Sequence, residues 1–364
     1  MRVGFVGWRG MVGSVLRQRM LAEGDFAGLE PVFFSTSEAG SPAPDVGQGG
    51  GILQDAFDLK ALAQMDVVVT CQGGDWTQAM YTPLRQAGWT GAWIDAASTL
   101  RTADESVLIL DPVNRHVIDA AVAAGCRTFV GANCTVSVLL MGLVGLLRAD
   151  LVEWISTMTF QAASGAGAAA MQELVAQMGL LGAVQQPGQD VLALDAAVAA
   201  VLADAHLPTD ALKVPIAGSA IPWIDKAVEG GRTREEWKAG YETRKLLDLP
   251  APLPVDGLCV RIGAMRSHAH GATVKLKKAI PINEIEAIIA KAHPWVQVVE
   301  NAPEPTRAHL TSAAAAGSLM VRVGRLHTLS MGPEYLAAFV VGDQLLWGAA
   351  EPLRRMLLIL RGLL

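Results

Sequence analysis

Three glycines near the start of the chain constrain its fold more than any other feature. Residues 3–6 are apolar, and Gly7, Gly10 and Gly13 follow them in a G-x-x-G-x-x-G pattern. A helical pattern then covers residues 11–21. A glycine turn between a strand and a helix lets the backbone approach a pyrophosphate, which then lies at the positive end of the helix. The motif therefore predicts a parallel α/β sheet that opens with a dinucleotide-binding turn.

The rest of the first 130 residues repeats this alternation. Apolar strands are expected near residues 31–34, 66–70, 92–94 and 107–110, with helices near 75–87 and 111–124. Continuous apolar strands separated by helices are typical of a parallel sheet that is covered on both faces. We therefore predict a Rossmann-type domain over residues 1–132.

The remainder of the chain has a different pattern. Longer strands, several with polar–apolar alternation, are expected near 154–163, 255–264, 272–276, 319–325 and 336–341. Helices lie between them, which favours an α+β domain with antiparallel strands. We predict this second domain over residues 133–342, and a final helix over 343–364 that returns to the first domain.

Composition excludes several kinds of partner. The net charge is −6 and there is no Lys/Arg-rich run, so no nucleic-acid partner is expected. The longest apolar run, residues 136–147, is interrupted by polar and glycine residues and is too short to span a bilayer. Four scattered cysteines without zinc spacing favour reduced thiols in a cytoplasmic protein and no metal site. A charged fraction of only 18% favours an oligomer with a buried apolar interface.

Cys134 is the candidate nucleophile. It lies between a short apolar strand pattern, residues 128–130, and an apolar helix that runs to about Leu147. The free N–H groups and the dipole at a helix start favour a thiolate, and the same N–H groups could hold an oxyanion. The alternative is that Cys134 is a small buried hydrophobic residue.

The residues after the second strand bear on the choice of cofactor. NAD enzymes usually have an acid at the end of this strand, whereas this chain has Ser35, Thr36 and Ser37. Hydroxyl groups there, with Arg9 nearby, suit a 2′-phosphate, so we predict NADP(H). Glu38 argues against this assignment, and an ordinary polar loop is the alternative.

Other charged residues could bind substrate or move protons. His268 and His270 would point to one side of an extended segment, where one could act as a general base. Metal binding by this pair would need a third ligand, and none is suitably spaced. Arg101 follows a strand end, where its guanidinium could hold a phosphate or carboxylate. Glu242 and Lys245 lie on one helix face, either as a stabilising pair or at a pocket rim.

Together these residues give the chain a strong resemblance to aspartate-β-semialdehyde dehydrogenases of the bacterial type. The resemblance covers nearly the whole chain, in order. The matching segments are residues 4–14, 32–37, 70–74, 94–98, 129–135, 161–167, 221–226, 254–257 and 342–352. Two departures are Ala168-Ala169, where relatives have Arg-His, and His270, where relatives have an uncharged polar residue.

The resemblance implies a homodimer that reduces L-aspartyl-4-phosphate with NADPH, in lysine, threonine and methionine synthesis. The second domain would be catalytic and would form the dimer. Cys134 matches a nucleophile that forms a thioester, His268 an acid–base residue, and Gln161 a residue that positions the acyl group. Arg261 matches the arginine that binds the substrate carboxylate.

The resemblance assigns further contacts by motif. Glu242 matches the acid that binds the substrate amino group, and Arg101, Asn133 and Lys245 match the phosphate site. The cofactor contacts would be Gly7, Arg9, Gly10, Met11, Val12, Gly13, Thr36, Ser37, Gln72, Ser164, Gly165 and Gln344.

Three alternatives remain open. An N-acetyl-γ-glutamyl-phosphate reductase would use the same thioester chemistry, but its substrate has no free amine for Glu242. A glyceraldehyde-3-phosphate dehydrogenase is more distant, because its substrate has no amino-acid end. A non-catalytic NADP-binding regulator would be expected to lack the thiol or its base, yet Cys134 and His268 are both present.

Overall fold

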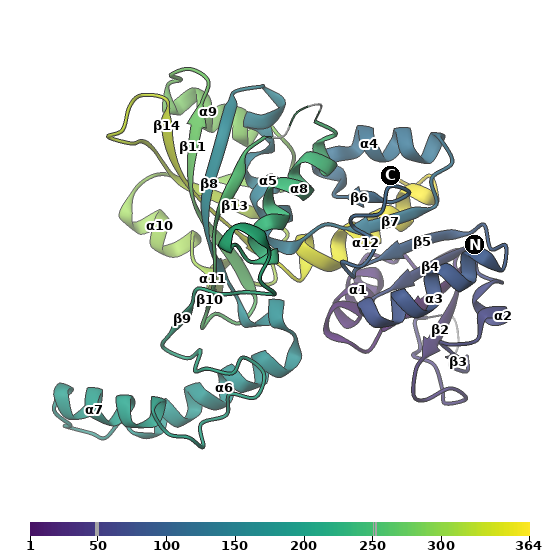
Figure 1. Ribbon diagram of the computed structural model, residues 1–364, viewed down its shortest axis with the longest axis horizontal. Helices are drawn as coiled ribbons and strands as arrows, with labels where there is room; N and C mark the ends of the chain where they lie inside the picture. Colours follow the sequence, from purple (N-terminus) through teal and green to yellow (C-terminus); the bar gives the residue numbers. More distant parts are fainter. Residues whose placement is uncertain (48–50, 250, 252) are drawn as a thin grey trace.

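The computed structural model describes residues 1–47, 51–249, 251 and 253–364. Within them, the chain forms two seven-stranded sheets, each with its own layer of helices. Figure 1 shows the two sheets side by side, with the N-terminal one on the right and the later one on the left.

The first sheet is parallel throughout, as predicted, in the order β3-β2-β1-β4-β5-β7-β6. Strand order reverses between β1 and β4, which is where ligands bind in such sheets. Its central strands are buried on both faces, which explains their continuous apolar sequences. The strands are β1 (Arg2–Val6), β2 (Glu30–Ser35), β3 (Gln54–Asp55), β4 (Val67–Thr70), β5 (Ala92–Asp95), β6 (Val107–Ile109) and β7 (Thr128–Gly131). The helices are α1 (Met11–Ala22), α2 (Leu59–Leu62), α3 (Gly74–Gln86) and α4 (Asp111–Ala123).

The second sheet is mixed, in the order β12-β13-β14-β11-β8-β10-β9. Most of its pairs are antiparallel, as predicted, but β8 and β10 pair in parallel. The long connection between β8 and β10 contains helices, so the chain can cross over and return in the same direction. β12 and β13 are also parallel. The strands are β8 (Val152–Gln161), β9 (Ala220–Ile221), β10 (Val255–Ile262), β11 (Ser267–Leu276), β12 (Val296–Val298), β13 (Val321–Thr328) and β14 (Tyr335–Asp343).

Helices cover the two faces of the second sheet unequally. Three helices, α5 (Cys134–Arg148), α8 (Arg234–Leu247) and α9 (Ile282–Ala290), pack on one face and share a large apolar core with it. α5 is buried along almost its whole length, which explains its apolar sequence. On the other face, the short helices α10 (Pro303–His309) and α11 (Ser312–Ala315) lie near the β13–β14 side.

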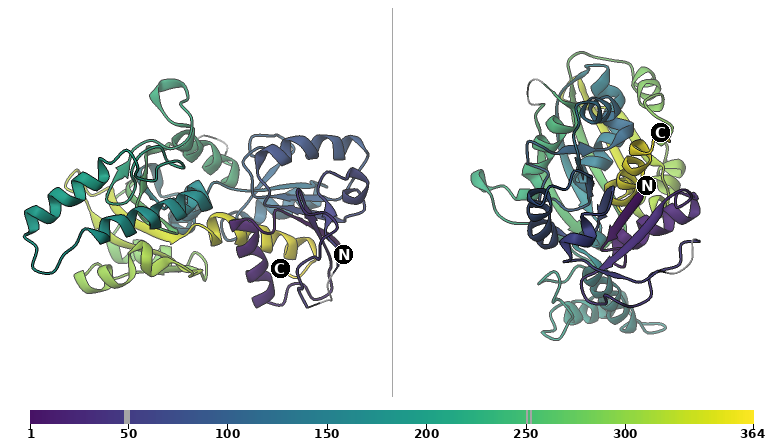
Figure 2. Two further views of the ribbon diagram at one scale, coloured as in Figure 1. Left: turned by 90° about the horizontal axis from the view of Figure 1, so that it is seen from below. Right: turned by 90° about the vertical axis from the view of Figure 1, so that its right-hand side faces the viewer.

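Two helices project from this domain as an arm. They are α6 (Ala168–Ala183) and α7 (Val191–Leu202), and both lie at the lower left of Figure 1. The left view in Figure 2 shows the same arm at the left-hand end of the molecule. α7 is strongly apolar in sequence, yet none of its residues is buried. A surface of this kind marks a site of association.

The end of the chain returns to the first sheet. The predicted final helix begins later than residue 343, because β14 continues to Asp343 and a π-helical turn (Leu346–Ala350) follows. α12 (Glu351–Leu360) then packs into the apolar core of the first sheet. Arg354 reinforces this contact through an ion pair with Asp25 (2.5 Å), and it also pairs with Glu351 within α12 (2.7 Å). No helix in the described part of the chain is both long and apolar enough to cross a membrane.

Candidate active site

Cys134 is the first residue of α5, directly after the end of β7 and the N-cap Asn133. The Asn133 side chain accepts hydrogen bonds from the backbone N–H groups of Thr135 (2.9 Å) and Val136 (3.3 Å), which fixes the helix start. Gly348 lies against the cysteine from the C-terminal segment, since a Cβ at Gly348 would be 2.7 Å from the Cβ of Cys134. The nucleophile therefore lies where the two sheets meet.

His268 is fully buried on β11, with its Nε2 3.3 Å from the Sγ of Cys134. Its Nδ1 accepts a hydrogen bond from the backbone N–H of Ala162 at 3.0 Å. A neutral imidazole carries one ring proton, so this contact places the proton on Nε2, facing the sulfur. Burial, together with the nearby charge of Arg261, lowers the pKa of His268 well below its ordinary value. His268 is thus a neutral proton donor toward Cys134.

Burial, followed by the charge of Glu235, raises the pKa of the Cys134 thiol to about 11. Arg101, Arg261 and Lys238 act in the opposite direction. Burial therefore opposes the thiolate that the helix start was expected to favour, because it takes the charge out of water.

A cavity of about 460 Å³ opens beside Cys134 and brings together residues from both sheets. Arg101 enters it from the loop after β5, and Arg261 enters it from β10. Arg261 is anchored by a 2.6 Å hydrogen bond to the carbonyl of Ala162. The predicted site residues that line the cavity are Val12, Arg101, Asn133, Cys134, Gln161, Ser164, Gly165, Arg261 and Gln344.

The glycine-rich segment after β8 lets the backbone pass close to these side chains. A Cβ at Gly165 would lie 2.7 Å from the Nη1 of Arg261 and 3.1 Å from the Nε2 of His268. Gln344 donates a 2.7 Å hydrogen bond to the hydroxyl of Ser164 and so joins this segment to the end of β14. His270 lies deeper, with its Nδ1 3.1 Å from the Oγ1 of Thr157.

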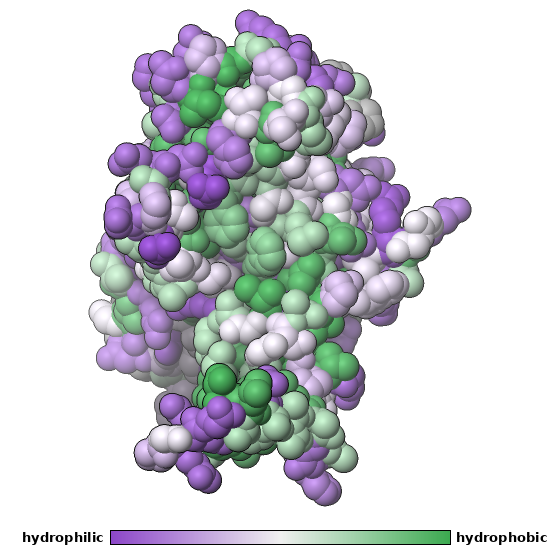
Figure 3. Space-filling model, turned by 90° about the vertical axis from the view of Figure 1, so that its left-hand side faces the viewer, coloured by the Kyte–Doolittle hydropathy of each residue, from purple (hydrophilic) through white to green (hydrophobic). Residues whose placement is uncertain are grey.

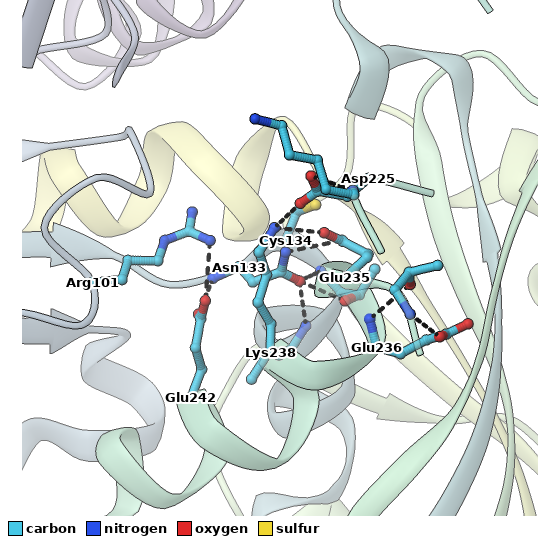
Figure 4. Close-up of polar contacts among 12 residues, drawn as sticks. Arg101, Asn133, Cys134, Asp225, Glu235, Glu236, Lys238 and Glu242 are labelled. Carbon is cyan, nitrogen blue, oxygen red and sulfur yellow. Dashed lines mark hydrogen bonds and ion pairs between the residues drawn. The ribbon is translucent and has the colours of Figure 1, made fainter. Parts of the chain in front are cut away.

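The structure reveals a charged cluster on α8 that was not predicted. The Nζ of Lys238 lies 2.8 Å from a carboxylate oxygen of Glu235 and 2.9 Å from one of Asp225, and all three residues line the cavity. Figure 4 shows the cluster beside Cys134 and Asn133. Glu235 also accepts hydrogen bonds from the side-chain amides of Asn133 (2.9 Å) and Gln161 (3.3 Å).

These contacts determine the ionisation of the cluster. Burial opposes the charge of Glu235, but the Lys238 charge and the hydrogen bonds to Glu235 outweigh burial and lower its pKa. Burial likewise opposes the charge of Lys238, but its acidic neighbours raise its pKa. Both side chains are therefore charged at neutral pH, and the cavity contains a fixed carboxylate as well as cations.

Glu242 and Lys245, which were predicted to bind substrate, do not line this cavity. The Glu242 carboxylate accepts a hydrogen bond from the backbone N–H of Asn133 (2.5 Å) and pairs with Arg101 (3.2 Å). Lys245 donates to the carbonyls of Arg101 (2.8 Å) and Ala103 (2.7 Å). Both side chains are thus occupied in holding the Arg101 loop in place.

The sequence also contains a signal for the pair that lines the cavity. Glu235 and Lys238 repeat the i, i+3 pattern of Glu242 and Lys245 seven residues earlier, which is two turns along the same face of α8. Spacing alone cannot choose between two such pairs. The choice depends on where Asn133, in the segment after β7, meets α8, which is a tertiary contact.

The glycine turn fits a nucleotide. Gly7 has a φ of +73°, and a Cβ there would lie 2.4 Å from the backbone of Gln72. A Cβ at Gly13 would lie 2.2 Å from the carbonyl oxygen of Gly7. These positions therefore require glycine, and they leave a cavity of about 270 Å³ above the turn. Its lining consists of Gly7, Trp8, Arg9, Gly10, Phe34, Ser35, Thr36, Cys71 and Gln72.

Three predicted cofactor residues line neither this cavity nor the cavity beside Cys134. Met11 begins α1, and Gly13 packs against the turn. The hydroxyl of Ser37 accepts a 3.2 Å hydrogen bond from Arg9 at the cavity edge. In the described part of the chain, no three His, Cys, Asp or Glu side chains converge in an arrangement that could hold a metal ion.

Two family models match this chain. The NAD-binding domain of semialdehyde dehydrogenases matches residues 2–121, and their dimerisation domain matches residues 143–347. The chain thus has both parts of a semialdehyde dehydrogenase, which is an oxidoreductase. An aspartate semialdehyde dehydrogenase from Francisella tularensis is 45% identical and has a TM-score of 0.96, with 99% of this chain and 100% of that chain covered. This chain belongs to the aspartate semialdehyde dehydrogenase family.

More distant structures share the fold. Aspartate semialdehyde dehydrogenase II from Vibrio cholerae, complexed with ASA, is 23% identical with a TM-score of 0.80, covering 99% of this chain and 98% of that chain. The Candida albicans enzyme with NADP is 17% identical with a TM-score of 0.66, covering 100% of this chain and 99% of that chain.

Proposed function

We propose that this protein reduces L-aspartyl-4-phosphate to L-aspartate-4-semialdehyde with NADPH, through a thioester on Cys134. The observation that carries the proposal is the 3.3 Å contact between Cys134 Sγ and His268 Nε2 in a cavity with a guanidinium from each domain. A substrate with a phosphate at one end and a carboxylate at the other needs two such cations. Turnover of this substrate would supply a step in lysine, threonine and methionine synthesis.

The covalent chemistry follows from the thiol. The sulfur of Cys134 attacks the acyl carbonyl and the C–O bond to phosphate breaks, which leaves a thioester, and the departing phosphate takes the thiol proton. The cofactor, when bound, supplies a hydride to the thioester carbonyl. The C–S bond then breaks, the aldehyde leaves and Cys134 is regenerated. His268 can hydrogen-bond from its Nε2–H first to the negative oxygen and then to the departing thiolate while keeping this proton, and the thiolate then takes up a proton from water.

The remaining residues of the cavity account for the substrate's other groups. Arg261 would bind the α-carboxylate, and Arg101 with Asn133 would bind the phosphate. We assign the α-amino group to Glu235, whose carboxylate is ionised and lines the cavity. Lys238, held beside Glu235, would add positive charge for the phosphate. Gln161 would position the acyl group from the end of β8.

The proposal is tested by phosphate-dependent reduction of NADP by L-aspartate semialdehyde, which is the reverse reaction. N-acetyl-glutamate semialdehyde, NAD and a Cys134→Ala variant provide the comparisons. Turnover that requires the aspartate substrate, phosphate and Cys134 would establish the reaction and its nucleophile. Turnover of the acetylated substrate alone would favour the reductase of that substrate. Nucleotide binding without turnover of either aldehyde would favour a non-catalytic regulator.

We also propose a homodimer whose interface includes the arm and the uncovered face of the second sheet. Val191 and Leu192 on α7 are 71% and 75% exposed, and Met158 and Leu258 on neighbouring strands are 43% and 50% exposed. Figure 3 shows apolar side chains across the middle and lower part of one face of the molecule. A second copy would remove this surface from water. Light scattering coupled to gel filtration would give the mass of a monomer if this proposal is wrong.

We further propose that the two domains have different roles. Residues 1–132, joined by 343–364, would bind the nucleotide, and residues 133–342 would bind substrate and form the dimer. Support comes from the shared core of the first sheet and α12. A cytoplasmic location is supported by the four cysteines, which are all free thiols in the structure.

A further inference from the structure

Arg9, at the edge of the nucleotide cavity, already has a carboxylate partner. Its guanidinium pairs with Glu38 and also donates to the hydroxyls of Ser37 (3.2 Å) and Ser35 (3.4 Å). The hydrogen bond from Arg9 lowers the pKa of the Glu38 carboxyl, which is therefore ionised at neutral pH. The group best suited to a 2′-phosphate is thus neutralised within the chain.

The loop after β2 holds Glu38 in this position. The Ser35 hydroxyl accepts hydrogen bonds from the backbone N–H groups of Ser37 (3.3 Å) and Glu38 (3.0 Å), which folds the chain back just after the strand ends. The turn brings the Glu38 carboxylate to the guanidinium of Arg9, beside a cavity lined by Ser35 and Thr36. This edge therefore combines an acid, which suits a ribose 2′-hydroxyl, with an arginine, which suits a 2′-phosphate.

We propose that Glu38 determines cofactor specificity by competing with the 2′-phosphate for Arg9, so that the site accepts NAD as well as NADP. The inference rests on one part of the proposed function, which is that this cavity binds a nicotinamide nucleotide. It concerns the choice between two nucleotides and does not depend on the identity of the aldehyde.

The competition follows from the charges. A 2′-phosphate carries between one and two negative charges at neutral pH, so NADP must draw Arg9 away from Glu38 and leave two anions side by side. The 2′-hydroxyl of NAD can donate to the Glu38 carboxylate while the ion pair with Arg9 persists. Arg9 and Glu38 are 41% and 50% exposed, so water screens these charges and the effect is moderate.

The test is equilibrium binding by titration calorimetry, on the full chain and its Glu38→Gln variant. The probes are NADP⁺, NAD⁺, adenosine 2′,5′-bisphosphate and AMP. The amide keeps the size of the side chain and removes its charge. We expect the variant to bind NADP⁺ and adenosine 2′,5′-bisphosphate roughly tenfold more tightly, with the gain shrinking at high salt. NAD⁺ and AMP carry the same free 2′-hydroxyl, so both should bind about two- to fivefold more weakly.

A matched control is Glu30→Gln. Glu30 lies at the opposite end of β2, pairs with Arg2 and is 67% exposed, so this variant changes the net charge equally. It should alter no nucleotide's affinity. Equal gains in NADP⁺ affinity in both variants would show that only net charge matters, and would overturn the proposal.

Other results separate the inference from the proposed function. The role of Glu38 would be overturned if the ratio of NADP⁺ to NAD⁺ affinity in Glu38→Gln differed from that of the native protein by less than about twofold, whatever the enzyme's activity. Failure of the native protein to turn over aspartate semialdehyde, with the ratio shifted as expected, would overturn the reaction and leave the specificity role standing. Kinetics should agree with binding, as a lower KM for NADP at unchanged kcat in the variant.

Discussion

Replacement of Lys238 by Met would test the charged cluster of the active site directly. The ammonium group lies between the carboxylates of Glu235 and Asp225, and the side chains of Lys238 and Glu235 are only 10% and 7% exposed. Removing one partner of a buried pair typically costs about 3–5 kcal/mol, because the other charge remains in low dielectric. Glu235 keeps its hydrogen bonds from Asn133 and Gln161, and Asp225 is 26% exposed. We therefore expect a loss near the lower limit, about 3 kcal/mol, at neutral pH.

The loss should depend on pH with a definite sign. In the native protein the pKa of Glu235 is lowered, so its pairing stabilises the fold above the carboxyl's ordinary pKa of 4.5 and is lost in acid. Without Lys238, burial raises the Glu235 pKa instead, and protonation then removes the buried charge. The difference in unfolding free energy between the two proteins should thus be largest near pH 7 to 8 and shrink as the pH falls.

The assay is urea denaturation of both proteins at equal concentration, at neutral and acidic pH. A Lys238→Met/Glu235→Gln double variant should regain most of the stability, because no charge is stranded, yet remain impaired in KM for the aldehyde. Lys238→Arg keeps the charge and should retain stability. A loss below about 1 kcal/mol at neutral pH, or a double variant as unstable as the single one, would refute this account of the cluster.

Three further perturbations have definite expected outcomes. The rate of Cys134 alkylation by iodoacetamide should rise steadily up to a pH of about 11, since burial raises the thiol pKa to that value, and a plateau near pH 7 would contradict this. Gly13→Ala should abolish nucleotide binding in calorimetry, because its Cβ would lie 2.2 Å from the Gly7 carbonyl, whereas Gly182→Ala, with no neighbour within 4 Å, should bind normally. Arg354→Met should lower the unfolding free energy by about 3–5 kcal/mol, because it removes the cationic partner of the buried carboxylates of Asp25 and Glu351. An unchanged urea midpoint would contradict this.

The first sheet was predictable because its sequence signals are local. Each central strand is buried on both faces, so its residues read as an uninterrupted apolar run, and the glycine turn fixes the strand–turn–helix order. Cys134 and Arg261 could be picked out by motif because short segments carry them, and the structure places both at one cavity.

Other features depend on tertiary contacts, which no single segment of the sequence reveals. Glu235 and Glu242 both follow the same helical spacing on one face of α8, and which one reaches the cavity depends on where Asn133, after β7, meets the helix. The thiol pKa of Cys134 depends on burial contributed by distant segments, such as that around Gly348. The parallel pairing of β8 with β10 depends on the crossover between them, whose path a strand pattern does not show.

The return of α12 to the first sheet has a consequence for how the protein is made. Synthesis from the N-terminus completes the strands of that sheet once β7 has emerged from the ribosome. Its apolar core also includes residues 350–359, so one face stays uncovered while the whole second domain is translated. A circular permutant that began before Leu346 would place α12 ahead of β1 and remove this delay. In the natural order, the nucleotide-binding half is begun first and finished last.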